Sequence, residues 1–349
     1  MKKSLVIALS VAVSMLGLSG PAAAQQSPAP KPWYKQTFDP ARVQPCDRAC
    51  LTAIGDQFLA AMEKQDMSGL PLAEQVFVTE NSGRIALGEG VLWHAHIERT
   101  GFHVTVADPV SGQVAMQLVY NIEGRPAMVA IRLKVDRHMI TEVEQLHDRN
   151  VAPQAMELLT TPRPTLLQDV APRERASRDF LIYAAHAYFD ALTGEDGSIA
   201  PFADDCVRHE QGYQTVANKT PGRGSPSPNL PDTSTEMGRI FSRLSTMTCA
   251  EQVDTGIFAG IKSIWPRRMV VDEQKGLVAV FPLFVHDGTK RPVPADSIGG
   301  SRPGIGMVIN LVTMETFGIR GGKIHEVEAF PFVTIPYGLG DGWTPAPGR

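Results

Sequence analysis

The sequence predicts an α+β protein built from two tandem copies of one domain. Two observations support this prediction: the chain resembles itself at fixed offsets, and in each copy a helical pattern comes before several β-rich runs. Strands that follow helices are typical of α+β proteins, whereas parallel α/β folds alternate the two. The chain has 349 residues, of which 43% are hydrophobic, so it can form two cores.

The N-terminus has the pattern of a secretory signal peptide over residues 1–24. Two lysines precede an apolar stretch from Leu5 to Leu18, and small residues follow up to Ala24. We expect an exported protein, periplasmic or extracellular, with residues 25–45 as a disordered N-terminal segment. No later stretch is long and apolar enough to predict a membrane span.

The internal repeat is clearest where residues 58–82 align without a gap on residues 188–212. This offset of 130 residues pairs Ala61 with Ala191, Asp66 with Asp196, Ser68 with Ser198, Pro71 with Pro201, Ala73 with Ala203 and Glu80 with Glu210. Offsets of 164 and 184 residues align later segments, which include the pairs Asp108 with Asp272 and Glu142 with Glu326. Matches at this density indicate a duplication.

The offsets also predict the domain organisation. We expect a first domain over residues 46–150, a proline-rich and partly extended linker over 151–175, and a second domain over 176–343. The rising offsets place insertions of 34 and 20 residues in the second copy. These contain the segments TPGRGSPSPNLPDTS and TKRPVPADSIGGSRPGIG, which predict long loops that are either solvated or functional.

Within the second copy the elements follow in a plain order. Apolar side chains recur at helical spacing over residues 178–192, and a short strand is expected around Cys206–Glu210. A second helical region covers roughly Met237–Ile264. Three β-rich runs then follow, punctuated by glycines that are typical of antiparallel hairpins.

Four cysteines in an exported chain indicate disulfides rather than catalysis, and they allow three pairings. Cys46 and Cys50 can close a small loop at a helix start, which leaves Cys206 to pair with Cys249. The zinc alternative lacks a ligand motif, so we expect no metal site. The formal net charge of −4 without a basic run argues against nucleic-acid binding. No nucleotide-binding or acyl-enzyme motif is present, so we expect no cofactor.

The copies resemble the SnoaL-like branch of the nuclear-transport-factor-2-like superfamily. The segments that carry this resemblance are LTGED, IAPFADDCVRHEQG and GIRGGKIHEVEAF, with PLAEQVFVTENS and VDRHMITEVEQL in the first copy. The chain is also similar, through CDRACL, VTENS and LGEGVLW, to a family of secreted tandem proteins of unassigned function. The resemblance implies cone-shaped domains, each with helices on a strongly curved antiparallel sheet that encloses a pocket.

The second copy further resembles the ketosteroid-isomerase pattern of that superfamily. Tyr188 precedes Asp196 by eight residues, and ADDCVRHE places a carboxylate at Glu210. Glu315 matches a third acidic position if one turn is shorter, whereas Gln211 stands where the pattern has proline. The resemblance implies that Glu210 is a general base and that Tyr188 and Glu315 donate hydrogen bonds to an oxyanion.

Alternatives exist for these residues. Tyr188 also fits a core tyrosine, because it lies on the apolar stripe of its helix. Strand alternation places Arg208 on the same face as Glu210, where an ion pair would weaken the base. Among the remaining candidates we expect His325 inside the cone, with Glu326 and Glu328 at a surface or interface. The expected ligand contacts are Arg208, His209, Trp265, Arg267 and Phe317, although the arginines near Trp265 also fit a charged strand edge.

The first copy carries Phe58, Glu80 and Ile131 at the positions of Tyr188, Glu210 and Glu315. This loss of polar groups predicts a structural or regulatory role for the first domain. The alternative is a different chemistry that uses Thr79, Glu80, Asn81 and Trp93.

Together these patterns predict a cofactor-independent isomerase or lyase. Its substrate would be a small, largely apolar carbonyl or phenolic compound in the pocket of the second domain. The alternative is a secreted ligand-binding or assembly module without turnover. We also expect a homodimer formed through sheet faces.

Overall fold

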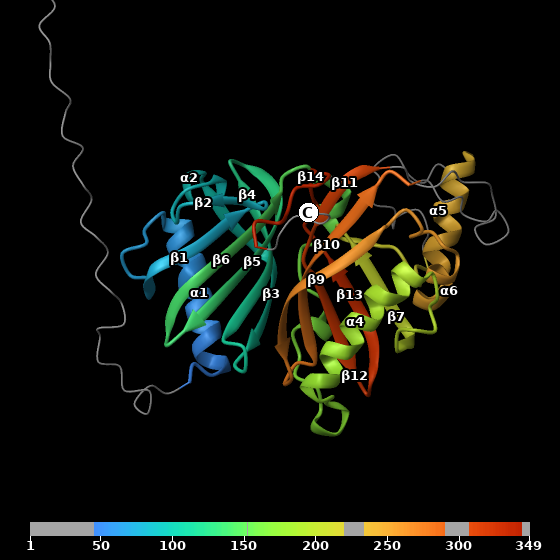
Figure 1. Cartoon of the computed structure of the whole chain (residues 1–349), viewed down its shortest axis with the longest axis horizontal. Coiled ribbons are helices and arrows are strands. Elements are labelled where there is room, and N and C mark those ends of the chain that lie inside the picture. The colour runs from blue at the N-terminus through green and yellow to red at the C-terminus, as the bar shows by residue number, and fades with distance from the viewer. Residues whose placement is uncertain (1–44, 152, 220–233, 290–306, 344–349) are drawn as a thin grey trace, which may run out of the picture. The chain divides into compact units, whose positions relative to one another are not determined.

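The computed structural model describes residues 45–151, 153–219, 234–289 and 307–343. The expected signal peptide, the N-terminal segment up to residue 44 and most of the two expected long loops lie outside these residues. Residues 44–349 form one compact unit with two sheets, which we call the first half (residues 46–150) and the second half (176–343). The α+β class is confirmed, and Figure 1 labels helices and strands of both halves.

The first half consists of one long helix, α1 (Arg48–Lys64), and a six-stranded sheet in the order β2-β1-β6-β5-β4-β3. Asp47 caps α1, because its side chain accepts a hydrogen bond from the Cys50 amide. The strands are β1 (Leu72–Glu80), β2 (Gly83–Ile85), β3 (Ile97–Asp108), β4 (Gln113–Ile122), β5 (Arg125–Asp136) and β6 (Met139–Asp148), with a short helix α2 (Val91–His94) before β3.

The second half repeats this plan around α4 (Arg178–Gly194), which Ser177 caps. Its strands are β7 (Phe202–Glu210), β8 (Tyr213–Gln214), β9 (Ser263–Asp272), β10 (Leu277–Asp287), β11 (Val308–Val312), β12 (Glu315–Arg320), β13 (Lys323–Ala329) and β14 (Val333–Pro336). Two helices, α5 (Glu236–Thr246) and α6 (Cys249–Asp254), occupy the expected second helical region, although its last residues belong to β9.

Each sheet departs from the expected antiparallel pattern at one pair of strands. β1 runs parallel to β6, and β7 runs parallel to β13, whereas the other pairs are antiparallel. The reason is topological, because the first strand after the long helix returns beside the last strand of the meander. This closure brings Glu210 next to Ala329, and Glu80 next to Gln145.

The two sheets pack against each other through the faces that their own helices do not cover. On β4 the even-numbered residues pack with α1, whereas Ala115 and Val119 join a core that contains residues of β10 such as Ala279 and Phe281. On β10 the residues Val278 and Val280 pack instead with α4. We call the helix-covered side of each sheet its inner face and the other side its outer face. β4 and β10 are therefore buried along almost their whole length, and most of their residues are apolar.

Two equivalent ion pairs connect the halves at equivalent positions of the repeat. Arg178 at the start of α4 contacts Asp108 of the first half through two bonds of 2.7 Å. Arg48 at the start of α1 contacts Asp272 of the second half at 2.8 Å. The outer faces of the two sheets are buried against each other within the chain, and the expected homodimer stays a prediction.

The linker is more structured than the sequence analysis predicts. It contains a short helix α3 (Pro153–Leu158) and two 3-10 turns, Pro164–Leu166 and Pro172–Glu174. Leu159 and Leu166 are fully buried in the core between the sheets. Apolar contacts with both halves therefore outweigh the extended preference of the prolines.

Both disulfides have the predicted pairing. Cys46 is bonded to Cys50 at the start of α1, and Cys206 of β7 is bonded to Cys249 of α6. The second bond fastens the helices α5 and α6 to the sheet. None of the helices within the described ranges has the length and hydrophobicity that crossing a membrane requires.

Candidate functional site

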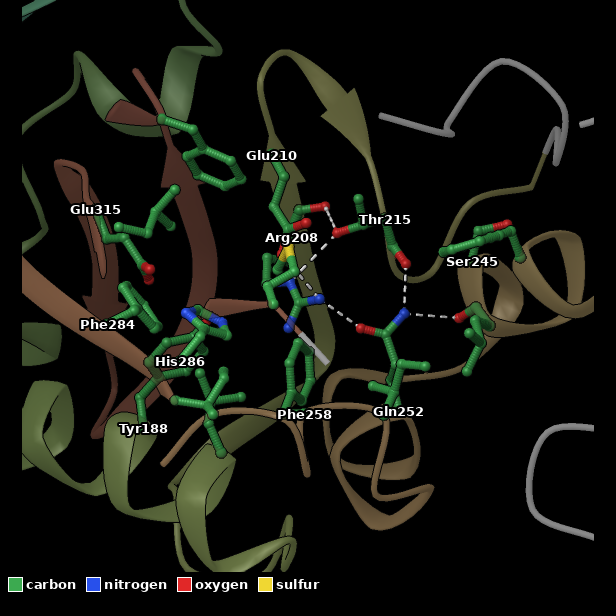
Figure 2. A pocket seen from close by; sticks show the side chains of 18 of the residues that line it. Tyr188, Arg208, Glu210, Thr215, Ser245, Gln252, Phe258, Phe284, His286 and Glu315 are labelled. Atoms are coloured by element: carbon green, nitrogen blue, oxygen red, sulfur yellow. Dashed lines mark hydrogen bonds and ion pairs between the residues drawn. The ribbon is translucent and has the colours of Figure 1, made fainter. Parts of the chain in front are cut away.

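A cavity of about 420 Å³ lies in the second half between α4, the inner face of the sheet and the helices α5 and α6. Most of its wall is apolar. The apolar residues that line it are Leu192, Phe241, Leu244, Ile257, Phe258, Ile261, Phe284, Met307, Ile309, Leu311 and Phe332. The polar ones are Tyr188, Arg208, Glu210, Thr215, Ser245, Gln252, His286 and Glu315 (Figure 2).

β7 supplies Arg208 and Glu210, which both line the cavity as strand alternation predicts. The guanidinium of Arg208 donates to Gln252 Oε1 at 2.5 Å and to Thr215 Oγ1 at 3.2 Å. It also forms an ion pair with Glu210 Oε1 at 3.0 Å and lies 4.7 Å from the ring centroid of Phe258. Arg208 is thus held rigidly in a buried position, and Figure 2 shows these bonds on one side of the cavity.

Glu315 reaches the cavity from β12. Glu210 and Glu315 pair with the same residue, Ala329, from the two sides of β13, so their side chains share the inner face. Two strand spacings separate their backbones by roughly 10 Å. The sequence match of Glu315 required one shorter turn, and the structure places Glu315 in the same cavity as Glu210.

The carboxyl group of Glu315 is buried, and one of its oxygens, Oε2, has no hydrogen-bond partner. Burial raises the pKa of Glu315 to about 8, and the negative charge of Glu210 also raises it. The charge of Arg208 and a hydrogen bond from Tyr188 act in the opposite direction but are weaker. At neutral pH Glu315 is therefore a neutral acid that can donate a hydrogen bond.

Tyr188 lies on the apolar stripe of α4, and its ring packs against Phe189, Phe202 and Phe317. The residue is 3% exposed and still lines the cavity. Burial, followed by the charge of Glu315, raises the pKa of Tyr188 well above its ordinary value. The core and cavity interpretations of Tyr188 thus both hold, because the ring is packed and the neutral hydroxyl faces the acidic groups.

Sequence reasoning missed four polar residues of the cavity, Thr215, Ser245, Gln252 and His286. The imidazole Nδ1 of His286 is buried without a hydrogen-bond partner, and burial lowers the pKa of this histidine. A signal for His286 exists in the sequence, because it shares the parity of Val278, Val280 and Phe284 on β10. No comparable signal marks Gln252, whose position depends on how α6 folds over the sheet.

Two of the expected ligand contacts lie near the cavity without lining it. Phe317 is completely buried behind Tyr188, at a centroid distance of 4.9 Å. His209 points to the outer face of the sheet, because it alternates with Arg208 and Glu210 along β7. Both assignments as ligand contacts need correction for this reason.

Three further candidates are placed away from the cavity, and β-bulges are the reason for two of them. Arg267 is the extra residue of β9 between the residues that pair with Phe281 and Pro282, and it contacts Glu144 and Asp341 between the halves. His325 is the extra residue of β13, and its Nδ1 contacts Asp205 at 2.5 Å.

Trp265 of β9 does not line the cavity. Its side chain is 37% exposed, and its indole nitrogen donates a hydrogen bond to the Ser263 hydroxyl. The expectation that His325 faces inward is wrong for the reason given above, and Glu326 and Glu328 occupy the outer face. They lie at an interface as expected, but the interface is buried within the chain.

The equivalent site of the first half is built differently. Glu80 accepts hydrogen bonds from the amides of Val91 and Leu92 and lies 3.4 Å from His147. Burial raises the pKa of Glu80, but these bonds outweigh that effect and lower it. Phe58 packs edge-on against Trp93 at 5.5 Å. Glu80 therefore has a structural task in fixing α2.

Residues 174–331 match a family described as "Domain of unknown function (DUF8021)", which covers α4 to β13. No curated protein matches the chain.

Three solved structures are similar. An NTF2-like protein of unknown function from Cytophaga hutchinsonii is 13% identical over 28% of this chain and 89% of its own, with a TM-score of 0.24. A cystatin-like-fold protein of unknown function from Methylobium petroleophilum is 12% identical over 46% and 80%, with a TM-score of 0.27. AclR of Streptomyces galilaeus, a proposed hydroxylase, is 13% identical over 34% and 89%, with a TM-score of 0.25. Likeness at this level carries no functional information.

Proposed function

We propose that the second-half cavity binds a small, largely apolar carbonyl or phenolic compound and catalyses proton transfer on it, as an isomerase or lyase without a cofactor. The observation that carries this proposal is the neutral Glu315 carboxyl, whose Oε2 lacks a partner, beside Tyr188 in an apolar cavity. Two neutral donors in such a site suit a developing oxyanion.

In the proposed reaction Glu210 removes a proton from the carbon next to the substrate carbonyl. The carbonyl oxygen becomes an enolate oxygen, and Tyr188 and Glu315 stabilise it by hydrogen bonds. The proton returns from Glu210 to another carbon in an isomerase. In a lyase, the enolate electrons instead form a carbon–carbon double bond and expel a leaving group from the neighbouring carbon, and the leaving group takes the proton from Glu210. The apolar wall excludes water and strengthens these bonds.

A second function, ligand binding without turnover, is favoured by one specific contact. Arg208 holds the Glu210 carboxylate at 3.0 Å, and an ion pair of this kind stabilises the charged form at the expense of basicity. In a binding module Glu210 and Arg208 would serve only to orient a polar group of the ligand.

Deuterium exchange distinguishes the two functions. The full chain is incubated in D2O with a panel of small ketones, such as a tetralone, and loss of the proton next to the carbonyl is followed by NMR. We expect exchange by the wild type and a loss of about 10² to 10⁴ in Glu210→Gln, which removes the base and preserves volume.

Glu80→Gln is the matched control, because it changes the equivalent carboxylate of the first half. We expect it to retain most of the exchange. Binding of a panel member without exchange would favour the binding module, and equal losses in both variants would mean that each half has its own site.

We also propose that the chain is exported to the periplasm or the extracellular space. The signal-like residues 1–24 and the two disulfides support this localisation, because disulfides persist in oxidising compartments.

A further inference from the structure

A second cluster of chemically active side chains lies on the outer face of the second sheet, away from the cavity. It consists of His209 on β7 and of Glu326 and Glu328 on β13. His209 and Glu328 are direct partners in the parallel pair, and Glu326 lies two residues earlier on the same face. Each of the three offers a ligand atom, and these atoms all lie within 4.8 Å of one another.

The cluster is buried, since the exposed fractions of His209, Glu326 and Glu328 are 9%, 2% and 0%. The linker covers it. Arg163 contacts both carboxylates, and the Thr165 hydroxyl donates to Glu326. Two carboxyl groups thus face one guanidinium.

Several polar atoms in the cluster have no hydrogen-bond partner. They are His209 Nδ1 and both carboxylate oxygens of Glu328, of which one is within ion-pair distance of Arg163 but lacks hydrogen-bond geometry. Buried polar atoms are rarely left in this condition. One imidazole nitrogen of His209 is therefore available to a ligand.

The first half provides an internal comparison through the repeat. Its equivalents of Glu326 and Glu328 are Glu142 and Glu144, but Thr79 stands in the place of His209. Both carboxylate oxygens of Glu144 have partners there, in Arg132 and Arg267. Of the two halves, only the second therefore combines a histidine with a neighbouring carboxylate whose oxygens lack hydrogen-bond partners.

We propose that His209, Glu326 and Glu328 bind a divalent transition-metal ion, which takes the place of the Arg163 guanidinium. One imidazole and two carboxylates are ligands that suit zinc, manganese and iron. A divalent ion balances the two carboxylates, and Arg163, whose side chain is 26% exposed, has a path to solvent. The bound ion would join β7 to β13 behind Arg208 and Glu210.

Cobalt(II) is a suitable probe, because its visible absorption reports the ligand set. The full chain, with its disulfides intact, is titrated with Co2+ alone and by calorimetry with Zn2+. We expect one ion per chain. Arg163→Met should bind at least about tenfold more tightly, because the competing cation is gone, and His209→Gln should bind at least about a hundredfold more weakly.

Glu142→Gln is the matched control and should bind like the wild type. X-ray absorption of the wild type loaded with zinc provides a readout that needs no variant, and it should show one imidazole among oxygen ligands. The proposal is overturned if the wild type binds no ion, if only Arg163→Met binds one, or if His209→Gln binds as the wild type does.

Discussion

Glu210 and Glu315 face the same cavity, but their neighbours give the two carboxyl groups different properties. Glu210 has the guanidinium of Arg208 at 3.0 Å, whereas Glu315 Oε2 has no partner and its pKa is about 8. Different surroundings of this kind separate a base from an acid within one site. The assignment of roles in the proposed reaction follows from this difference.

The raised pKa of Glu315 predicts a stability that depends on pH. Between the ordinary value of 4.5 and about 8, the unfolded carboxyl ionises while the folded one stays neutral, so the wild type loses stability as pH rises. Glu315→Gln cannot ionise. We expect its free energy of unfolding, relative to the wild type, to rise by on the order of 5 kcal/mol between about pH 4.5 and pH 8. Urea unfolding at both ends of the window measures this.

Glu80 serves as a control, because its pKa is shifted in the opposite direction to that of Glu315. Its folded pKa is lowered, so its contribution is present above the unfolded pKa and is lost as pH falls. Glu80→Gln should therefore cost stability at neutral pH and little in acid. A difference between Glu315→Gln and the wild type that does not change with pH would show that Glu315 ionises normally.

At the scale of single elements, strand alternation predicted the cavity side chains of β7 correctly and failed at two bulges. One extra residue in β9 turns Arg267 to the outer face, and one in β13 removes His325 from both faces. The first half has an equivalent irregularity, because Thr141 is the extra residue between the partners of Lys134 and Val135. A bulge depends on the pairing strand, so a single strand's own pattern does not reveal it.

The helices α5 and α6 show another limit of prediction from sequence. Helical periodicity indicated a helical region there, but its contribution to the cavity, through Phe241, Gln252 and Phe258, depends on tertiary packing. The disulfide between Cys206 and Cys249 was the one sequence feature that tied α6 to β7. Gln252, three residues after Cys249, is held by the same attachment and bonds Arg208.

This attachment leads to a prediction on the disulfides. The Cys206–Cys249 bond spans 43 residues and the Cys46–Cys50 bond spans 4, so loop entropy assigns them about 4 and about 2 kcal/mol. We expect replacement of Cys206 and Cys249 by alanine to lower the free energy of unfolding by the larger amount. It should also weaken binding in the cavity. Denaturant unfolding and ligand titration of both double variants provide the measurements, and a greater loss from removing Cys46–Cys50 would contradict this argument.

At the scale of the whole molecule, the two halves form one compact unit through a shared core and through ion pairs that include Arg48–Asp272 and Arg178–Asp108. Asp108 is fully buried and accepts bonds from Arg178, Ser111 and the Val271 amide. Asp272 is also buried, but its partner Arg48 is 31% exposed and makes one contact. The two ion pairs therefore occupy equivalent positions, but Arg178–Asp108 has more bonds than Arg48–Asp272.

Arg178→Met should destabilise the chain more than Arg48→Met. The first variant removes the guanidinium that donates two hydrogen bonds to the buried Asp108 carboxylate, and such a loss typically costs about 3 kcal/mol of stability. The second variant also leaves a buried carboxylate, Asp272, but it removes a single bond from a side chain that is 31% exposed, so we expect a smaller cost. Thermal and urea unfolding of both variants test this order, and the reverse order would mean that the two-bond geometry contributes little.

The matched pairs Arg48–Asp272 and Arg178–Asp108 have the reciprocity of a two-fold dimer, in which residue i of one subunit meets residue j of the other and the reverse. In a dimer of identical chains every substitution appears twice. Covalent fusion removes that coupling, so one copy can change while its mate does not. Phe58 and Tyr188 occupy equivalent positions on the two helices, and only the second retains a hydroxyl. Within this one chain the two copies differ accordingly: Phe58 packs against Trp93 in the first half, whereas Tyr188 lines the largely apolar cavity of the second half.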